Sequence, residues 1–168
     1  RRATRAAAVA LVRPRAEGGV IVVTERELAV ASRDDLADLQ LWGPVLADAR
    51  QRFLGGACSP TGRLYLGTVG YVRTPGIAMV YRLDAGAAAG QPVAAGMTAA
   101  SGIDWSPDHR LCFVNDDGGT WAFDFEPNRG IFRQRLLFAS VFGPSDGLHV
   151  DAEGGLWVAH PHTGLLVR

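Results

Sequence analysis

The strongest constraint on this sequence is an internal repeat. Four times, a turn of small and charged residues leads into a short apolar run, and the turns lie near residues 14–19, 59–63, 106–110 and 151–155. Their aligned positions, Gly18, Gly62, His109 and Gly154, are 44, 47 and 45 residues apart. A period of about 40–50 residues with several short strands in each unit is typical of β-propeller blades. We therefore predict an all-β protein with the β-propeller fold.

Other apolar runs fit the remaining strands of each blade. One run precedes the turn at 103–105 and at 148–150, and a further run follows at 79–83 and at 120–125. The 21 glycines and 9 prolines interrupt the chain too often for a helical bundle, and only residues 33–50 have a spacing of leucines that approaches a helix. We expect one partial propeller domain over residues 1–168, with repeats near 12–50, 52–98, 100–140 and 144–168.

The number of repeats is small for a closed ring. A propeller usually has four to eight blades, and this chain contains about three and a half repeats. A half-ring would expose apolar blade faces at both ends. Two explanations remain open: the chain is a piece of a longer protein, or two copies complete one ring. In either case we expect self-association through open blade edges.

The composition excludes several function classes. The 17 arginines, with no lysine, balance 17 acidic residues, and the pI is 7.1. This balance gives no general attraction to nucleic acid or to an anionic membrane, so we expect neither as a partner. No apolar run approaches the roughly 20 residues of a membrane helix. Cys58 and Cys112 are too few for a disulfide scaffold, and we expect both to be reduced, buried thiols of a cytoplasmic protein.

A functional site is expected where the inner strands of successive blades begin. The glycines that we expect to open these strands are Gly56, Gly102 and Gly147, and the residues before them are Gly55, Ser101 and Asp146. Of these three, only Asp146 is a strong metal ligand, so the position forms an incomplete calcium or zinc site. Asp146 fits equally well as a turn residue and as a metal ligand or acid–base group.

The second strand of each blade runs back to the same rim. Its carboxyl ends are expected at residues 69–73, 115–117 and 160–162. We interpret residues 115–119 as an ordinary turn, and His160 and His162 as solvated loop residues. Trp105, Trp121 and Trp157 are interpreted as core residues.

Several segments resemble the regucalcin (senescence marker protein)/gluconolactonase family. They are GRLYLGT at 62–68, SGIDWSPD at 101–108, WAFDF at 121–125 and SDGLHVDAEGGLWVA at 145–159. The resemblance runs from about Gly18 to Arg168. It implies a six-bladed propeller, of which this chain covers roughly three to four central blades. It also implies one divalent cation, calcium or zinc, in the channel and the hydrolysis of sugar lactones.

The resemblance assigns roles to some residues, and at other positions this sequence lacks the family's functional residue. Asp146 matches the family's aspartate that binds the metal and acts as acid or base, although Ser145 replaces a proline. Ser101 stands where the family has an asparagine ligand, and its hydroxyl is a weaker ligand, so we expect weak metal binding. Arg52 matches the family's substrate-binding arginine, whereas Leu54 and Gly55 replace two polar residues of the same motif. The family's amino-terminal glutamate ligand has no counterpart.

Three interpretations of function follow. The first is a metal-dependent sugar-lactone hydrolase, impaired by its substitutions, with Asp116 or His160 as substitutes that could complete its site. The second is a catalytically silent propeller that acts as a binding scaffold. The third is a truncated product without an independent function.

Overall fold

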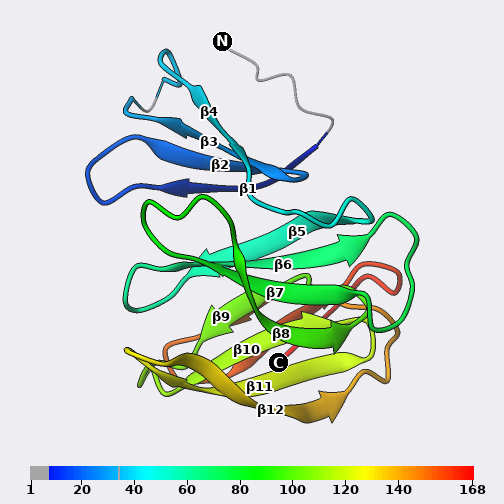
Figure 1. Ribbon diagram of the computed structural model, residues 1–168. Coiled ribbons are helices and arrows are strands. Elements are labelled where there is room, and N and C mark those ends of the chain that lie inside the picture. The colour runs from blue at the N-terminus through cyan, green and yellow to red at the C-terminus, as the bar shows by residue number, and fades with distance from the viewer. Residues whose placement is uncertain (1–7, 34) are drawn as a thin grey trace.

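The computed structural model describes residues 8–33 and 35–168, and all the regular structure in this part of the chain is β. Fifteen strands form four antiparallel sheets that follow one another in chain order (Figure 1). No helix among the described residues is long and apolar enough to cross a membrane.

The strands of each sheet are neighbours in sequence and form a simple meander. Sheet A consists of β1 (Val9–Pro14), β2 (Val20–Thr24), β3 (Glu27–Ala31) and β4 (Gln40–Pro44). Sheet B consists of β5 (Gln51–Cys58), β6 (Leu64–Gly70), β7 (Ala78–Leu83) and β8 (Gln91–Met97). Sheet C consists of β9 (Ile103–Trp105), β10 (Leu111–Asp116), β11 (Gly119–Glu126) and β12 (Gly130–Ala139). Sheet D has β13 (Asp146–Val150), β14 (Leu156–His160) and β15 (Leu165–Val167).

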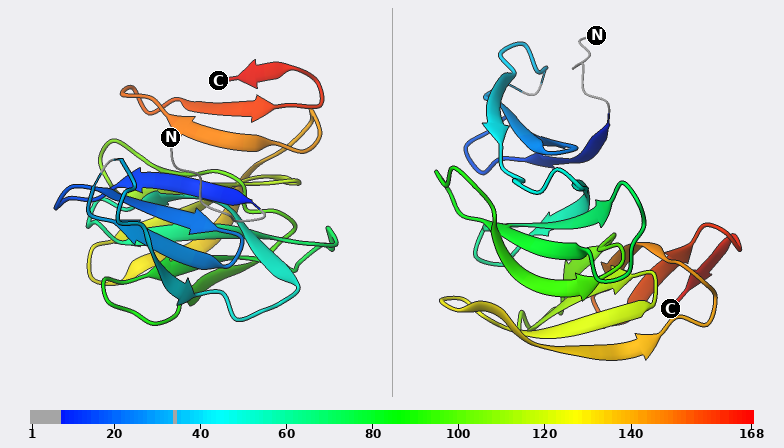
Figure 2. Two further views of the ribbon diagram at one scale, coloured as in Figure 1. Left: turned by 90° about the horizontal axis from the view of Figure 1, so that it is seen from above. Right: turned by 45° about the vertical axis from the view of Figure 1, so that its right-hand side comes forward.

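The first strand of each sheet is the inner one. β1 contacts β5, β5 contacts β9, and β9 contacts β13, so the sheets fan out from a common line like blades (Figure 2). Sheet A lies at one end of this fan and sheet D at the other (Figures 1 and 2). The predicted all-β propeller architecture is confirmed by this arrangement.

The repeating turn has the same backbone conformation in all four sheets. The aligned residues Gly18, Gly62, His109 and Gly154 have φ values of 85°, 78°, 59° and 85°. Glycine adopts this left-handed region without steric cost, and His109 is one of the few non-glycine residues that enter it here. The repeat in the sequence is therefore a repeat of one turn geometry.

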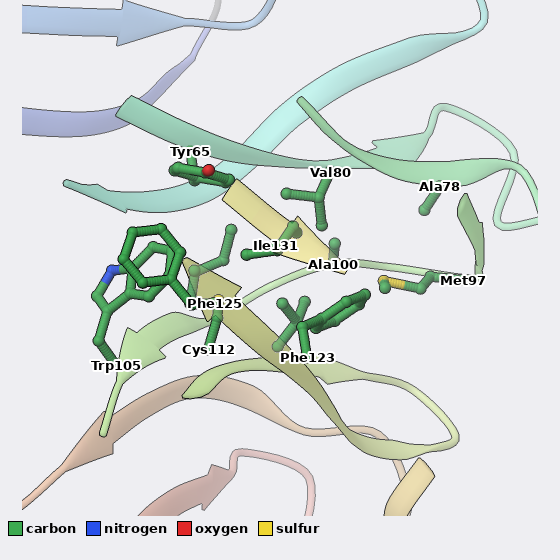
Figure 3. Packing of buried hydrophobic residues seen from close by; sticks show 12 residues of the cluster. Tyr65, Ala78, Val80, Met97, Ala100, Trp105, Cys112, Phe123, Phe125 and Ile131 are labelled. Atoms are coloured by element: carbon green, nitrogen blue, oxygen red, sulfur yellow. The ribbon is translucent and has the colours of Figure 1, made fainter. Parts of the chain in front are cut away.

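The core lies between neighbouring sheets rather than inside any one of them. Sheets B and C share a cluster of twelve buried residues (Figure 3), in which the Trp105 ring packs edge-on against Tyr65 and Phe125. A second cluster joins sheets A and B around Leu28, Phe53 and Leu66. Blade-to-blade packing was predicted for Trp105, which is 8% exposed.

Two local expectations are wrong. Gly56 does not open its inner strand, because β5 starts five residues earlier at Gln51. The segment with helix-like leucine spacing, 33–50, contains the strand β4, as the all-β prediction requires, since Gln40–Pro44 pairs with the edge of β3. Cys58 is exposed at the end of β5, whereas Cys112 is buried as expected, and both thiols are free.

Candidate functional site at the rim

The rim is the edge of the sheets at which β5, β9 and β13 begin and β6, β10 and β14 end. Strand register fixes this arrangement, because Gln51 pairs with Gly70 and Asp146 pairs with Ala159. In sheet C, the Ser101 amide donates to the Asn115 carbonyl oxygen at 3.1 Å. The three residues singled out in the sequence, Arg52, Ser101 and Asp146, therefore lie at equivalent ends of successive sheets.

Side chains at the rim connect sheet C to sheet D. The Ser101 hydroxyl donates to the Ser145 carbonyl oxygen at 3.2 Å, and the Ser145 hydroxyl donates to the Asp116 carbonyl oxygen at 3.2 Å. The Asn115 side-chain amide donates to the Gly147 carbonyl oxygen at 2.9 Å. These bonds hold the backbone on both sides of Asp146, so its position is fixed by the neighbouring sheet.

Asp146 itself has an exposed side chain at the start of β13. No described residue donates a hydrogen bond to its carboxylate or forms an ion pair with it. The carboxylate is consequently available to a ligand or to a water molecule. This is the property that a general base or a metal ligand requires.

The two proposed substitute ligands are engaged elsewhere. Asp116 is buried, and one of its carboxylate oxygens accepts hydrogen bonds from the backbone amides of Thr98 and Ala99, each at 2.8 Å. His160 is also buried, which contradicts the expectation of a solvated side chain, and its ring packs edge-on against Phe142. Asp116 therefore caps the entrance to sheet C, and His160 belongs to the packing of sheet D.

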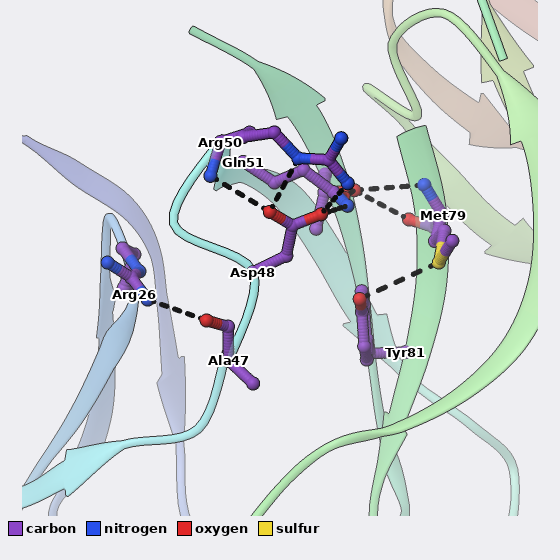
Figure 4. Close-up of polar contacts among 8 residues, drawn as sticks. Arg26, Ala47, Asp48, Arg50, Gln51, Met79 and Tyr81 are labelled. Carbon is purple, nitrogen blue, oxygen red and sulfur yellow. Dashed lines mark hydrogen bonds and ion pairs between the residues drawn. The ribbon is translucent and has the colours of Figure 1, made fainter. Parts of the chain in front are cut away.

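A polar network fixes the start of β5 beside Arg52 (Figure 4). The buried Gln51 side chain donates to Asp48 at 3.0 Å and accepts a 2.6 Å hydrogen bond from the Thr68 hydroxyl. Hydrogen bonds from the Arg50 side chain and amide, and from Gln51, hold the pKa of Asp48 well below its usual range. The half-buried Arg52 is thereby placed on a rigid strand end.

The substitutions at 54 and 55 have a packing explanation. A Cβ atom added to Gly55 would clash with the Ser101 backbone carbonyl oxygen, because β5 passes directly against the segment that leads into β9. Leu54, the neighbouring residue, is half-buried and brings no polar group. Close contact between sheets B and C thus replaces the polar side chains that the resemblance implies here.

Sequence reasoning missed a polar cluster of Arg73, Asp117 and His162, in which Arg73 and Asp117 form an ion pair. Arg73 Nη2 lies 3.1 Å from Asp117 Oδ1, although the two residues come from different sheets. Burial raises the pKa of Asp117, and Asp116 raises it further, while Arg73 and His162 lower it. The expectation that 69–73, 115–117 and 160–162 share a rim already placed these residues together. The sequence could not distinguish a binding role for Asp117 from that of an ordinary turn residue.

The rim does not make a complete cation site from the described residues. No group of three or more histidine, cysteine, aspartate or glutamate side chains in this part of the chain is arranged to hold a metal ion. Asp146 offers one carboxylate, and the Ser101 hydroxyl already donates to Ser145. Calcium prefers six to eight oxygen ligands, and zinc prefers four ligands, so these groups do not fit either ion on their own.

Comparison with known proteins gives the family. The model of the SMP-30/Gluconolactonase/LRE-like region matches residues 2–168. The chain belongs to this SMP-30/gluconolactonase family. Regucalcin from Danio rerio is 30% identical over 124 residues, covering 70% of this chain and 42% of that protein.

Two solved structures of family members have the same fold. A calcium-binding protein, regucalcin, from Agrobacterium tumefaciens superimposes with a TM-score of 0.79 at 18% identity, over 95% of this chain and 59% of that one. A gluconolactonase from Xanthomonas campestris gives 0.68 at 19% identity, over 89% and 55%. The prediction of a six-bladed type of propeller, of which this chain covers part, is confirmed by these structures together with the four sheets.

The chain spans 42–59% of the length of the curated relatives that it matches. Family membership therefore establishes the fold of this chain, and its activity is a matter of proposal.

Proposed function

We propose that the rim of this propeller hydrolyses sugar lactones, which are cyclic carboxylic esters. The observation that carries the proposal is the free, exposed carboxylate of Asp146, held in place by hydrogen bonds from sheet C to Ser145 and Gly147. Arg52 lies at the equivalent end of β5 and supplies a cation for the oxygens of the substrate. The gluconolactonase in the same family supports this class of substrate.

In the proposed reaction, Asp146 acts as general base. Its carboxylate takes a proton from a water molecule as the water oxygen attacks the carbonyl carbon of the lactone. The bond between that carbon and the ring oxygen then breaks, and Asp146 returns the proton to the ring oxygen, which leaves an open hydroxy acid. A general base of this kind typically contributes a factor of about 10²–10⁴ to the rate.

The divalent cation expected from the family resemblance does not fit the described residues alone. Calcium or zinc at this rim would need ligands beyond Asp146 and Ser101, so no step of the proposed reaction passes through a metal ion.

The first test is the substitution Asp146→Asn. We expect the rate of glucono-δ-lactone hydrolysis above the uncatalysed rate to fall by about 100-fold or more. Proton release should be followed with chelator, with calcium and with zinc. Asp124→Asn is the matched control, because Asp124 is an ion-paired aspartate on the outer part of sheet C. Equal rates for wild type and Asp146→Asn under all three conditions would contradict the proposed role.

A second function is favoured by the loss of polar side chains at positions 54 and 55 and by the weaker ligand at Ser101. A propeller that retains the scaffold but binds a small molecule without turning it over would tolerate Leu54 and Gly55. Binding of a non-hydrolysable lactone analogue, with no turnover of the lactone, distinguishes this binding scaffold from the hydrolase.

A further inference from the structure

We propose that Arg73 and Asp117 form a subsite at the rim that binds the hydroxyl groups of a polyhydroxylated ligand. The inference deepens the proposed function and rests on it, because it assigns the selection of sugar lactones over simple lactones to these two residues. The sequence places both residues at the rim but assigns neither a role in binding.

The hydrogen bonding of Asp117 is the first observation. Its side chain is 17% exposed, and its buried Oδ1 accepts no hydrogen bond from a described residue. Arg73 Nη2 lies 3.1 Å from Oδ1 without the geometry of a hydrogen bond. A buried carboxylate oxygen that receives no hydrogen bond is costly, and the ion pair with Arg73 offsets part of that cost.

The neighbouring aspartate shows that this is a property of Asp117 rather than of the turn. Asp116 is buried as well, but two backbone amides and the Trp121 indole N–H donate to its carboxylate. The described residues thus donate three hydrogen bonds to Asp116, whereas Asp117 has the ion pair with Arg73. Asp116 has a structural role, and Asp117 remains available for binding.

The cluster lies beside the proposed catalytic residue. Ser145, which precedes Asp146, donates to the carbonyl oxygen of Asp116, which precedes Asp117. His162 lies in the turn after β14, the strand that pairs with β13. Loops from sheets B, C and D therefore bring Arg73, Asp117 and His162 to the edge where Asp146 is exposed.

The charge of the pair selects the ligand chemistry. An anionic group would be attracted by Arg73 but repelled by Asp117, and a cation would meet the opposite pair of forces. A neutral hydroxyl group suits both residues, since it donates a hydrogen bond to a carboxylate and accepts one from a guanidinium. Arg73 is half-exposed and has further N–H groups to donate.

The test compares two lactones that differ in their hydroxyl groups, glucono-δ-lactone and δ-valerolactone, on the full chain. For Asp117→Ala and for Arg73→Met, we expect kcat/KM for glucono-δ-lactone to fall by about tenfold or more, mainly through KM. For δ-valerolactone, kcat/KM should stay within about twofold of wild type. Asp124→Ala is the matched control, because it removes an aspartate that is ion-paired with Arg135 away from the rim.

The outcomes separate this proposal from the proposed hydrolase. An equal loss on both lactones, or no loss on glucono-δ-lactone, overturns the subsite. If wild type hydrolyses neither lactone, the hydrolase proposal fails, and calorimetric titration with glucono-δ-lactam, the non-hydrolysable amide analogue, tests the subsite directly. Binding by wild type that both variants lose supports it, whereas no binding, or equal binding by wild type and variants, overturns it.

Thermal melting checks that Asp117→Ala folds, and Arg73→Met, in an exposed loop, provides the second variant.

Discussion

Asp151 organises the last sheet through a single carboxylate. It accepts hydrogen bonds from the amides of Glu153 and Gly155, from the Trp157 indole at 2.9 Å and from the Arg168 guanidinium at 2.8 Å. The bonds from Arg168 and Trp157 hold the pKa of Asp151 well below its ordinary value of 3.8. The interactions close the β13–β14 turn and attach the end of the chain to it.

The lowered pKa of Asp151 predicts an effect of acid on stability. The folded state lowers this pKa, so the carboxylate stabilises the fold at pH values above the pKa of the unfolded chain. That contribution is lost as the pH falls toward the pKa of the folded state. Asp151→Asn should lower the melting temperature at pH 7, and its difference from wild type should shrink between about pH 4 and pH 2. Tryptophan fluorescence melts at several pH values measure this difference. A difference that stays constant down to pH 2 would count against the prediction, and Glu17→Gln, at a side chain that is 88% exposed, is the control.

For single residues, the sequence predicted which side chains lie at the rim better than it predicted their burial and hydrogen bonding. It identified Asp146 and Ser101 as rim residues, but their roles in binding and catalysis stay predictions. It could not distinguish Asp116 from Asp117, because the difference lies in backbone amides of residues 98 and 99, which only tertiary packing brings near. His160 was misjudged for the same reason, since Phe142 from another segment covers it.

Among the strands, β5 and β6 pass very close to the segment that leads into β9. Gly55 of β5 lies against the Ser101 carbonyl, and Gly67 of β6 lies against Ala100 in the same segment. These glycines allow two sheets to pack at backbone distance, which a side chain would prevent.

Gly55→Ala should therefore destabilise the protein. The added methyl group would push β5 away from the segment before β9, and overpacking of this kind costs about 1–3 kcal/mol. Urea denaturation followed by tryptophan fluorescence measures the loss. Gly118→Ala is the matched control, because a Cβ there meets only an ordinary contact with the Asp116 side chain. A loss for Gly55→Ala no larger than for Gly118→Ala would contradict the explanation.

The strands next to the repeated turn were predictable because that turn has a signature of its own. Glycine or another residue tolerating positive φ stands at each aligned position, and an apolar run follows. β4 and the first half of β5 have no such signature. Their pairing with β3 and β6 decides their conformation, and that pairing is set by tertiary contacts that local sequence does not encode.

For the molecule as a whole, the unequal size of the sheets is the main feature. Sheets A, B and C have four strands, and sheet D has three. The outer strand of sheet D, β15, is an edge on which Leu166 is 64% exposed. Beside it lies a groove of about 380 Å³ with apolar walls that include Phe138, Phe142 and Val158. Exposed strand edges with apolar side chains favour pairing with further chains.

We expect the isolated chain to associate at increasing concentration through this edge. Leu166→Lys should shift the protein toward the monomer, because a lysine on an edge strand opposes pairing. Sedimentation velocity over a range of concentrations measures the shift. Val72→Lys, which places the same charge on an exposed residue of the loop between β6 and β7, is the control. Unchanged association for Leu166→Lys would show that another surface is responsible.

The hydrogen bonds across the rim have a consequence for how such a protein can diverge. The Ser101 hydroxyl joins two blades at a position where a metal ligand is expected, so ligand binding and assembly depend on the same side chain. A mutation that introduces a better ligand at Ser101 would also remove a bond between blades, and the reverse change would restore that bond and weaken the site. Selection for catalysis and selection for a well-assembled ring therefore act on the same residue, and a lineage that relaxes one can improve the other.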